Sequence, residues 1–346
     1  MSRSRLVAGS PNRKRRVMRK GAKQMRLFAG IALFFLTALA AALALTAVWF
    51  QAVPPWRWFW MAAVAACAIA IVIAGRRHSK AGWAGLAMAI VIGLAWWHSI
   101  APSNDRAWAP DVAHGVTADI KGPDIVLHNV RNFDWKSETE AVARWETRRY
   151  SLDQLVSVDL VSSVWASPAI AHTLISFGFA DGGHVVFSAE VRRERGEEFS
   201  EVGGFFKQFE LVMIAADEND IVKLRTNIRR EDVTLLPLRV TPAQARALFL
   251  GFADRANRID GQAEFYQTVT TNCTTVIFEL ARHIDGRVPL DWRILLSGYL
   301  PSYLFDLGLI RTDAPLDQVL RDAAISRKAL DAPPGADYSR AIRAGT

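Results

Sequence analysis

Apolar positions dominate the first hundred residues, whereas the rest of the chain alternates short apolar runs with polar segments. Three stretches lack Asp, Glu, Lys and Arg altogether: Leu27–Phe50, Trp58–Gly75 and Ala81–Ala101. A bilayer core of ~30 Å needs roughly 20 apolar residues at a helical rise of ~1.5 Å per residue. The pattern therefore predicts three membrane-spanning helices, at about 27–50, 58–75 and 81–101. The alternative is that one of the shorter stretches is a buried core helix.

The distribution of basic and acidic residues also changes after the third apolar stretch. Residues 1–101 contain 14 Lys and Arg, and the first acidic residue of the chain is Asp105. The remaining 245 residues carry 28 basic and 34 acidic residues, so the basic character belongs to the N-terminal part. This distribution does not fit a surface that neutralises phosphates, and we expect no nucleic-acid partner.

The flanking charges predict an orientation. Residues 1–26 form a basic tail with ten Lys and Arg, and Arg76–Lys80 is a second basic loop. The positive-inside rule places both in the cytoplasm of a bacterium, in its inner membrane, and residues 102–346 in the periplasm. The first stretch is too long for a signal peptide, lacks a convincing cleavage site and precedes two further stretches, so it should be retained. We expect the lipid bilayer to be its partner.

The remaining chain predicts an α+β domain. Residues 102–123 are polar with scattered Pro and Gly and are interpreted as a linker, followed by an exported domain at 124–346. Short apolar runs predict strands at Ile125–Asn132, Leu155–Trp165, Thr173–Phe179, His184–Arg192, Phe209–Ala215, Ile221–Thr226 and Val233–Leu238. Asp181-Gly182-Gly183 predicts a hairpin. Helices are expected at 242–259, 273–283 and 291–300, so the fold combines a largely antiparallel sheet with packed helices.

Common catalytic signatures are missing from this domain. The sequence has no Gly-x-Ser-x-Gly, His-Glu-x-x-His, Walker loop or Gly-x-Gly-x-x-Gly. It has two cysteines, of which Cys67 lies in the second apolar stretch and reads as a small apolar filler. Cys273 is alone in the domain, so we expect neither a disulfide nor a cysteine zinc site, and the sequence predicts no cofactor and no metal.

Cys273 lies in the run Thr270-Thr271-Asn272-Cys273-Thr274-Thr275. Asn272 or Thr271 is a good N-cap, which places Cys273 in the first turn of a helix. Backbone N–H groups and the helix dipole favour a thiolate there and can stabilise an oxyanion on a substrate. We interpret Cys273 as a nucleophile, the alternative being a buried small hydrophobe.

A thiol nucleophile needs a base, normally a histidine. The candidates outside the apolar stretches are His114, His128, His172, His184 and His283. His283 is about 15 Å from Cys273 along one helix and cannot reach it. His172 opens a strand, whose end can present an imidazole to a helix N-terminus, and it is preferred over His128.

A carboxylate should orient the imidazole. If the hairpin centres near residue 182, His172 lies opposite about residue 192, and alternation places Ser188, Glu190 and Arg192 on its face of the sheet. We expect Glu190 to orient His172. A register slip of one residue would undo this arrangement, and a salt-bridged rim of Glu and Arg is the alternative.

Together these segments resemble a known family. Six segments resemble the Lnb-type periplasmic domain family, named after a bacterial lipoprotein N-acyltransferase: the run from His172 to Phe179, the run from Phe187 to Glu197, Phe209-Glu210-Leu211, Leu224-Arg225-Thr226, Phe265-Tyr266 and Thr271-Asn272-Cys273-Thr274-Thr275. The order of His before Asn-Cys is also similar to circularly permuted papain-like enzymes of the NlpC/P60 type, which implies a papain-like fold.

The resemblance implies roles for individual residues. Cys273 would be the acyl-accepting nucleophile and His172 its base, with Asn272 and Tyr266 supporting the site. The implied reaction is acyl transfer to the α-amino group of a lipoprotein, from a lipoprotein or phospholipid acyl substrate. Trp165, Phe177, Phe179, Phe205, Phe206 and Phe209 could line an acyl slot, or could be simple core. A papain-like peptidase or amidase acting on cell-wall peptides and a non-catalytic membrane-tethered binding module are the alternatives.

Overall fold

The computed structural model describes residues 11–310 and 313–344 of the chain. The chain divides into two compact units, Met1–Ala101 and Pro102–Thr346, each of which is described by itself. The first unit contains α1 (Pro11–Gln51), α2 (Trp56–Arg77) and α3 (Ser79–Ser99). The first ten residues of the predicted basic tail lie outside the described residues, and the rest of that tail forms the start of α1.

Among the described residues, three helices are long and apolar enough to cross a membrane: Lys23–Gln51, Trp56–Arg77 and Ser79–Ser99. The prediction of three long apolar helices is therefore confirmed. Leu33 of α1 is buried beside the glycines of α2 and α3, and a Cβ on Gly82 would lie 2.5 Å from the Cα of Gly75. Small residues let helix backbones approach closely where lipid offers no hydrophobic driving force.

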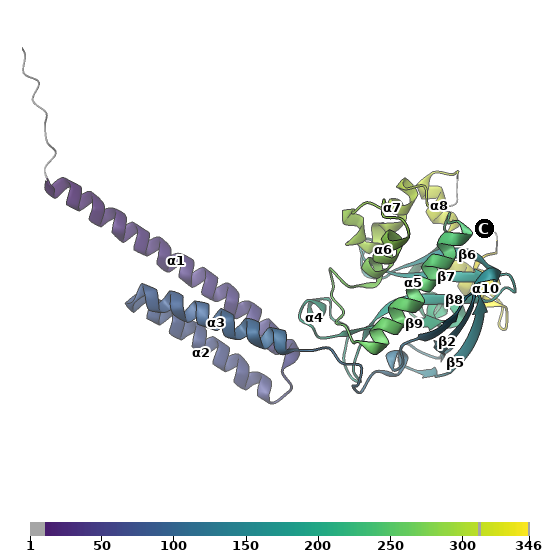
Figure 1. Ribbon diagram of the computed structural model, residues 1–346, viewed down its shortest axis with the longest axis horizontal. Helices are drawn as coiled ribbons and strands as arrows, with labels where there is room; N and C mark the ends of the chain where they lie inside the picture. The colour runs from purple at the N-terminus through teal and green to yellow at the C-terminus, as the bar shows by residue number, and fades with distance from the viewer. Residues whose placement is uncertain (1–10, 311–312, 345–346) are drawn as a thin grey trace, which may run out of the picture. The chain divides into compact units, whose positions relative to one another are not determined.

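The second unit is built on one large sheet (Figure 1). In the described part of this unit, eight strands form the sheet in the order β1-β2-β9-β8-β7-β6-β10, with β5 paired to β2. All its pairings are antiparallel except the short contact between β2 and β9. The strands are β1 (Thr117–Lys121), β2 (Asp124–Arg131), β5 (Trp145–Ser151), β6 (Leu155–Val164), β7 (Ala171–Phe179), β8 (His184–Arg192), β9 (Glu210–Ala216) and β10 (Asp232–Pro237). A separate small pair is formed by β3 (Asp134–Trp135) and β4 (Ala141–Val142).

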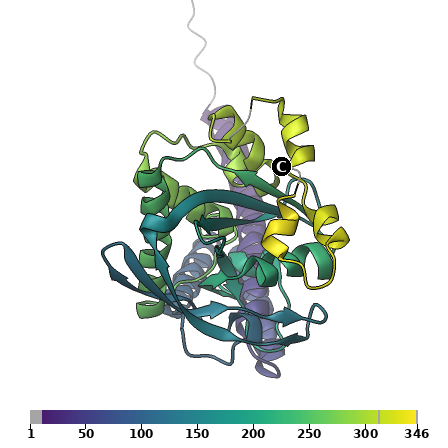
Figure 2. The same ribbon diagram turned by 90° about the vertical axis from the view of Figure 1, so that its right-hand side faces the viewer.

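Helices cover both faces of the sheet. The helices of this unit are α4 (Glu201–Phe205), α5 (Pro242–Gly261), α6 (Cys273–Ile284), α7 (Leu300–Asp306), α8 (Leu316–Asp322), α9 (Ser326–Asp331) and α10 (Tyr338–Ile342). Odd-numbered positions of β7 and β8, such as Phe177 and Phe187, pack against Phe249 and Phe252 of α5. Even-numbered positions such as Leu174 share a second core with α9 and α10. Figure 1 shows α5 lying along the sheet, and Figure 2 shows the C-terminal helices at its other side.

The β7–β8 hairpin determines where the site forms. Gly182 adopts a φ of 86°, which glycine tolerates, and the N–H of Phe179 donates to the carbonyl of Gly183. The pairing of the two strands runs from Gly178↔His184 to Ile175↔Phe187 and ends there. Each strand continues to pair with its outer neighbour, β7 as far as Ala171 and β8 as far as Arg192. The sheet therefore opens between β7 and β8 beyond Ile175.

Several predicted elements differ from the structure. Ile221–Thr226 was expected to be a strand but forms the π-helical segments η3 (Glu218–Val222) and η4 (Leu224–Ile228), which bury charged side chains. The expected helix at 291–300 is two short 3-10 turns, Trp292–Ile294 and Ser297–Tyr299, because Gly298 packs on the backbone of Pro168 and α7 begins only beside Pro301.

The segment interpreted as a linker belongs to the folded unit. It contains β1 and the 3-10 turn Pro110–Val112, and Trp108 is 6% exposed. Its polar residues and prolines resemble linker composition, but its few apolar side chains are buried. The structure is a mixed α+β fold, as predicted, while the papain-like architecture is not confirmed and stays a prediction.

Candidate functional site

Cys273 is the first residue of α6, at the opening between β7 and β8. Asn272 caps this helix, its Oδ1 accepting from the N–H groups of Thr274 and Thr275 at 2.9 Å each. The N–H of Val276 donates to the carbonyl of Asn272. The N–H of Cys273 is then the one first-turn donor that the cap does not use, so it is the donor that this turn can offer to an oxyanion.

The thiol of Cys273 is buried and polarised. Burial raises the pKa of the thiol, but the charge of His172 and hydrogen bonds with His172 and Thr173 lower it to about 6. The sulfur lies 3.8 Å from Oγ1 of Thr274, which is 3.0 Å from Oγ1 of Thr173, and Thr173 lies where β7 has left β8. The open sheet thus brings polar groups to the sulfur, and these favour the thiolate.

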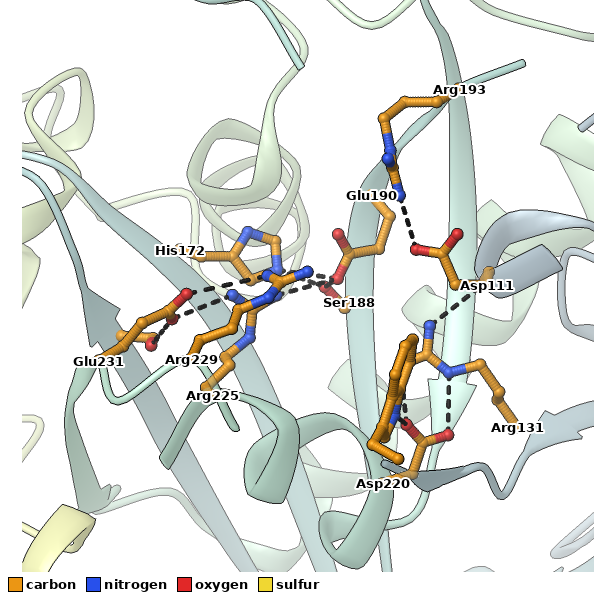
Figure 3. A network of polar contacts seen from close by, with 12 residues as sticks. Asp111, Arg131, His172, Ser188, Glu190, Arg193, Asp220, Arg225, Arg229 and Glu231 are labelled. Carbon is orange, nitrogen blue, oxygen red and sulfur yellow. Dashed lines mark hydrogen bonds and ion pairs between the residues drawn. The ribbon is translucent and has the colours of Figure 1, made fainter. Parts of the chain in front are cut away.

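His172 lies beside the Glu190 carboxylate (Figure 3), and it also interacts with the thiol of Cys273. Its Nε2 is 3.0 Å from Oε1 of Glu190 and 2.8 Å from Oγ of Ser188. Ser188 donates in turn to Oε1 of Glu190 at 2.8 Å. Because Nε2 is engaged by these groups, Nδ1 is the ring nitrogen left for Cys273. Burial lowers the pKa of His172, but the charges of Glu190 and Cys273 raise it to about 9 against the opposing charge of Arg225.

Glu190 is held in its ionised form. Burial raises the pKa of its carboxyl group, but the charge and hydrogen bond of His172, followed by the charge of Arg225 and the Ser188 hydroxyl, bring it well below its usual range. The arrangement is a thiolate–imidazolium–carboxylate line. A carboxylate on the far nitrogen of an imidazole fixes its orientation and stabilises the positive charge.

Further charged side chains lie next to the Cys273, His172 and Glu190 group. Arg225 lies 3.5 Å from Glu190 and 3.4 Å from Glu231, and its side chain is 6% exposed. Ser163 donates a short hydrogen bond to Glu231. The sequence interpretation missed Glu231 and gave Arg225 no role, because both were placed in or beside a supposed strand whose long-range partners no local pattern reveals.

A neighbouring cluster fixes the same wall of the site. Arg131 of β2 binds Asp220 of η3 through two hydrogen bonds, of 2.9 and 3.1 Å, and both side chains are buried (Figure 3). Asp220 also accepts from the N–H of Phe133 and the indole of Trp135. These bonds satisfy the buried charges and hold the π-helical segments against the sheet.

The catalytic candidates open into a cleft of about 880 Å³. His172, Glu190, Tyr266, Asn272 and Cys273 all line it. Exposed apolar side chains form part of its rim, namely Trp165, Phe199, Phe205, Val269, Leu295 and Leu296, beside charged side chains such as Glu138, Arg193 and Glu201. Tyr266 is 9% exposed, and burial followed by the charge of Cys273 raises the pKa of its hydroxyl. The cleft therefore joins a charged reaction centre to an entrance that carries a group of exposed apolar side chains.

Some predicted residues lie elsewhere. Arg192 shares the sheet face of Glu190 but donates to the carbonyls of Val112 and Ala113, so it is not part of the cluster. Of the suggested acyl-slot aromatics, Trp165 and Phe205 line the cleft, Phe206 is half-buried beside α4, and the other three are buried core: Phe177, Phe179 and Phe209.

The other histidines are engaged away from the thiol. His128 lies 3.0 Å from Asp119, and His283 lies against the carbonyl of its own helix at Glu279. His184 contacts the carbonyl of Gly182, and His114 packs on Trp145. Within the described residues, no group of three or more His, Cys, Asp or Glu is arranged to hold a metal ion.

The chain combines three membrane-capable helices with an α+β domain that brings a cysteine, a histidine and a carboxylate together. Residues 141–298 match the family described as the Lnb N-terminal periplasmic domain. This finding supports the Lnb resemblance, and the matched segment contains both His172 and Cys273. A periplasmic family and three membrane-capable helices fit a membrane-anchored protein. The curated proteins and the solved structures hold no match to the chain.

Proposed function

We propose that this protein is a cysteine-dependent acyltransferase that moves an acyl chain from a lipid ester to the α-amino group of a lipoprotein. The observation that carries the proposal is the line of Cys273, His172 and Glu190 at a helix N-terminus in a cleft with an apolar rim. In this proposal the domain lies in the periplasm at the inner membrane, with the N-terminus in the cytoplasm. Its partners are then the bilayer, the acyl substrate and the lipoprotein.

The reaction proceeds in two halves. The Cys273 thiolate attacks the ester carbonyl, and the N–H of Cys273 stabilises the oxyanion as the tetrahedral intermediate forms. When the ester C–O bond breaks, His172 gives its proton to the leaving alkoxide, which departs as an alcohol on the lysolipid. Neutral His172 then takes a proton from the attacking amine, the C–S bond breaks, and the products are an amide and the thiolate–imidazolium pair.

The apolar rim favours acyl transfer over cleavage of cell-wall peptides. Trp165, Phe199 and Phe205 are 44–49% exposed at the cleft. Large apolar side chains are costly to leave in water, and an acyl chain would cover them, whereas a polar muropeptide would not. If no lipid product forms, the alternative activity is that of an amidase acting on cell-wall peptides.

The test is the intact mass of lipoproteins from a strain that lacks other N-acyltransferases. Cells with the unaltered protein should add one acyl chain to the lipoprotein N-terminus, and Cys273→Ser should abolish the addition. Cys67→Ser, which changes the other cysteine, is the matched control and should retain it. An acyl addition that persists in Cys273→Ser would refute the nucleophile, and no addition in any strain would refute lipoprotein as the acceptor.

A further inference from the structure

A second hollow runs beside the thiol cleft, along the outer face of α6. It encloses about 720 Å³ between this helix and the turns at 290–295. Its walls are mainly apolar and include Phe278, Leu290, Trp292 and Ile294. We call this hollow the α6 groove. None of the proposed catalytic residues lines this groove.

The α6 groove continues into the thiol cleft. Val269 and Leu295 line both hollows. Cys273 is the first residue of α6, and the groove follows the same helix from Thr275 to His283. The eight steps between these residues span ~12 Å at ~1.5 Å per residue, so the groove extends away from the sulfur by about that length. A chain attached to Cys273 has an apolar path along the helix.

The walls of the groove are unusually open to solvent. Leu290 is 78% exposed, Trp292 59% and Leu295 55%. Contiguous exposed apolar side chains mark a surface that another apolar molecule covers. The third membrane-capable helix ends at Ser99 and the folded unit begins at Pro102, so this unit is tethered within a few residues of the bilayer. A membrane lipid is thus the apolar molecule within reach.

We propose that the α6 groove binds the acyl chain of a membrane lipid whose ester carbonyl lies at Cys273. The inference rests on the proposed function, because it treats the thiol as the acyl acceptor. The inference adds that the protein recognises the long acyl chain itself, and that Trp292 and Leu290 determine the specificity for chain length. Short acyl groups reach the thiol without using the groove.

The first arm of the test does not depend on catalysis. The full-length Cys273→Ser protein is placed in nanodiscs that contain phosphatidylethanolamine with a diazirine at the end of one acyl chain. After illumination, labelled peptides should include residues of the α6 groove between Val269 and Leu295. The labelling should be lost in Leu290→Asp/Trp292→Asp and retained in the control Val156→Asp, which alters a side chain that is 63% exposed outside the groove. Labelling confined to the three membrane helices would overturn the proposal.

The second arm measures acyl-enzyme formation by intact mass with short-chain and long-chain activated esters. Trp292→Asp should slow acylation by the long chain about tenfold, the effect of losing roughly 55 Å² of apolar contact, and leave acylation by the short chain unchanged. Trp292→Phe should restore the long-chain rate. If Trp292→Asp slowed acylation by both esters equally, the proposal that the groove binds the acyl chain would be overturned. If neither ester acylated the unaltered protein, the proposed function itself would be refuted.

Discussion

Replacing Glu190 by Gln should lower the thiolate fraction of Cys273 without removing any atom of the cysteine or the histidine. The carboxylate lies 3.0 Å from Nε2 of His172, and its charge opposes the burial that would otherwise make the imidazole neutral. With Glu190 present, the pKa of His172 is about 9 and that of Cys273 about 6, so the ion pair is populated between these pH values. Gln keeps the size of the side chain but removes its charge.

The size of the effect follows from the same groups. Without the carboxylate, burial and the charge of Arg225 bring the pKa of His172 to its ordinary ~6.5 or lower, which costs the imidazolium at least ~3 kcal/mol. Losing that positive charge returns the thiol to an ordinary pKa of ~8.5 or above. At pH 7 the thiolate fraction then falls from about nine tenths to a few hundredths, a reduction of about 30-fold.

Alkylation by iodoacetamide measures the thiolate directly. In a Cys67→Ser background, the rate for the Glu190-containing protein should rise through pH 6 and be high at pH 7, since protonation of the thiol ends the ion pair only below its lowered pKa. The Glu190→Gln variant should react about 30-fold more slowly at pH 7, and its alkylation rate should rise only above pH 8. Glu194→Gln, at a carboxylate that pairs with Arg106, is the matched control. A Glu190→Gln variant with an unchanged rate and an inflection still near pH 6 would refute the electrostatic account.

Three further changes test the supports of the site. Asn272→Ala removes the acceptor of two helix N–H groups and should destabilise the protein by ~1–2 kcal/mol, seen as a lower Tm, and an unchanged Tm would contradict the capping role. Arg131→Met leaves the buried Asp220 carboxylate without its cation and should cost ~3–5 kcal/mol in unfolding experiments, part of it recovered by adding Asp220→Asn, which removes the charge and keeps an acceptor; a single variant of unchanged stability would rule out this pairing. His184→Ala should leave thiol alkylation at its original rate, and a slower rate would mean that the wrong histidine has been paired with Cys273.

Local patterns predicted the parts of the site that local chemistry specifies. Asn272 was one of two expected caps, with Thr271, because a capping side chain needs only the next three residues, and the structure selects Asn272. Gly182 marked a turn that needs a positive φ. The hairpin centre was misplaced by one residue, which shifts the expected partner of His172 from position 192 to position 190. A shift of two in partner number keeps the same face of the sheet, so Ser188 and Glu190 still face the imidazole.

The errors arose where distant residues decide the structure. Asp220 and Arg225 lie in or beside an apolar run that reads as a strand, but their partners Arg131 and Glu231 allow both charges to be buried in π-helical turns. Arg192 was assigned to the site from alternation alone. Its long side chain instead reaches the carbonyls of Val112 and Ala113, which sequence spacing does not place beside it. Long-range pairing of this kind leaves no periodic signal.

The most direct test of the central claim is whether a fatty acyl group becomes attached to Cys273. The full-length protein is incubated with phospholipid in nanodiscs, quenched in acid, and digested for mass spectrometry. The account predicts a fatty acyl adduct on the peptide that contains Cys273, released by neutral hydroxylamine as a thioester is, absent in Cys273→Ser and strongly reduced in His172→Ala. A protein that transfers acyl chains while its Cys273 peptide stays unmodified, or an adduct that forms equally well without His172, would contradict it.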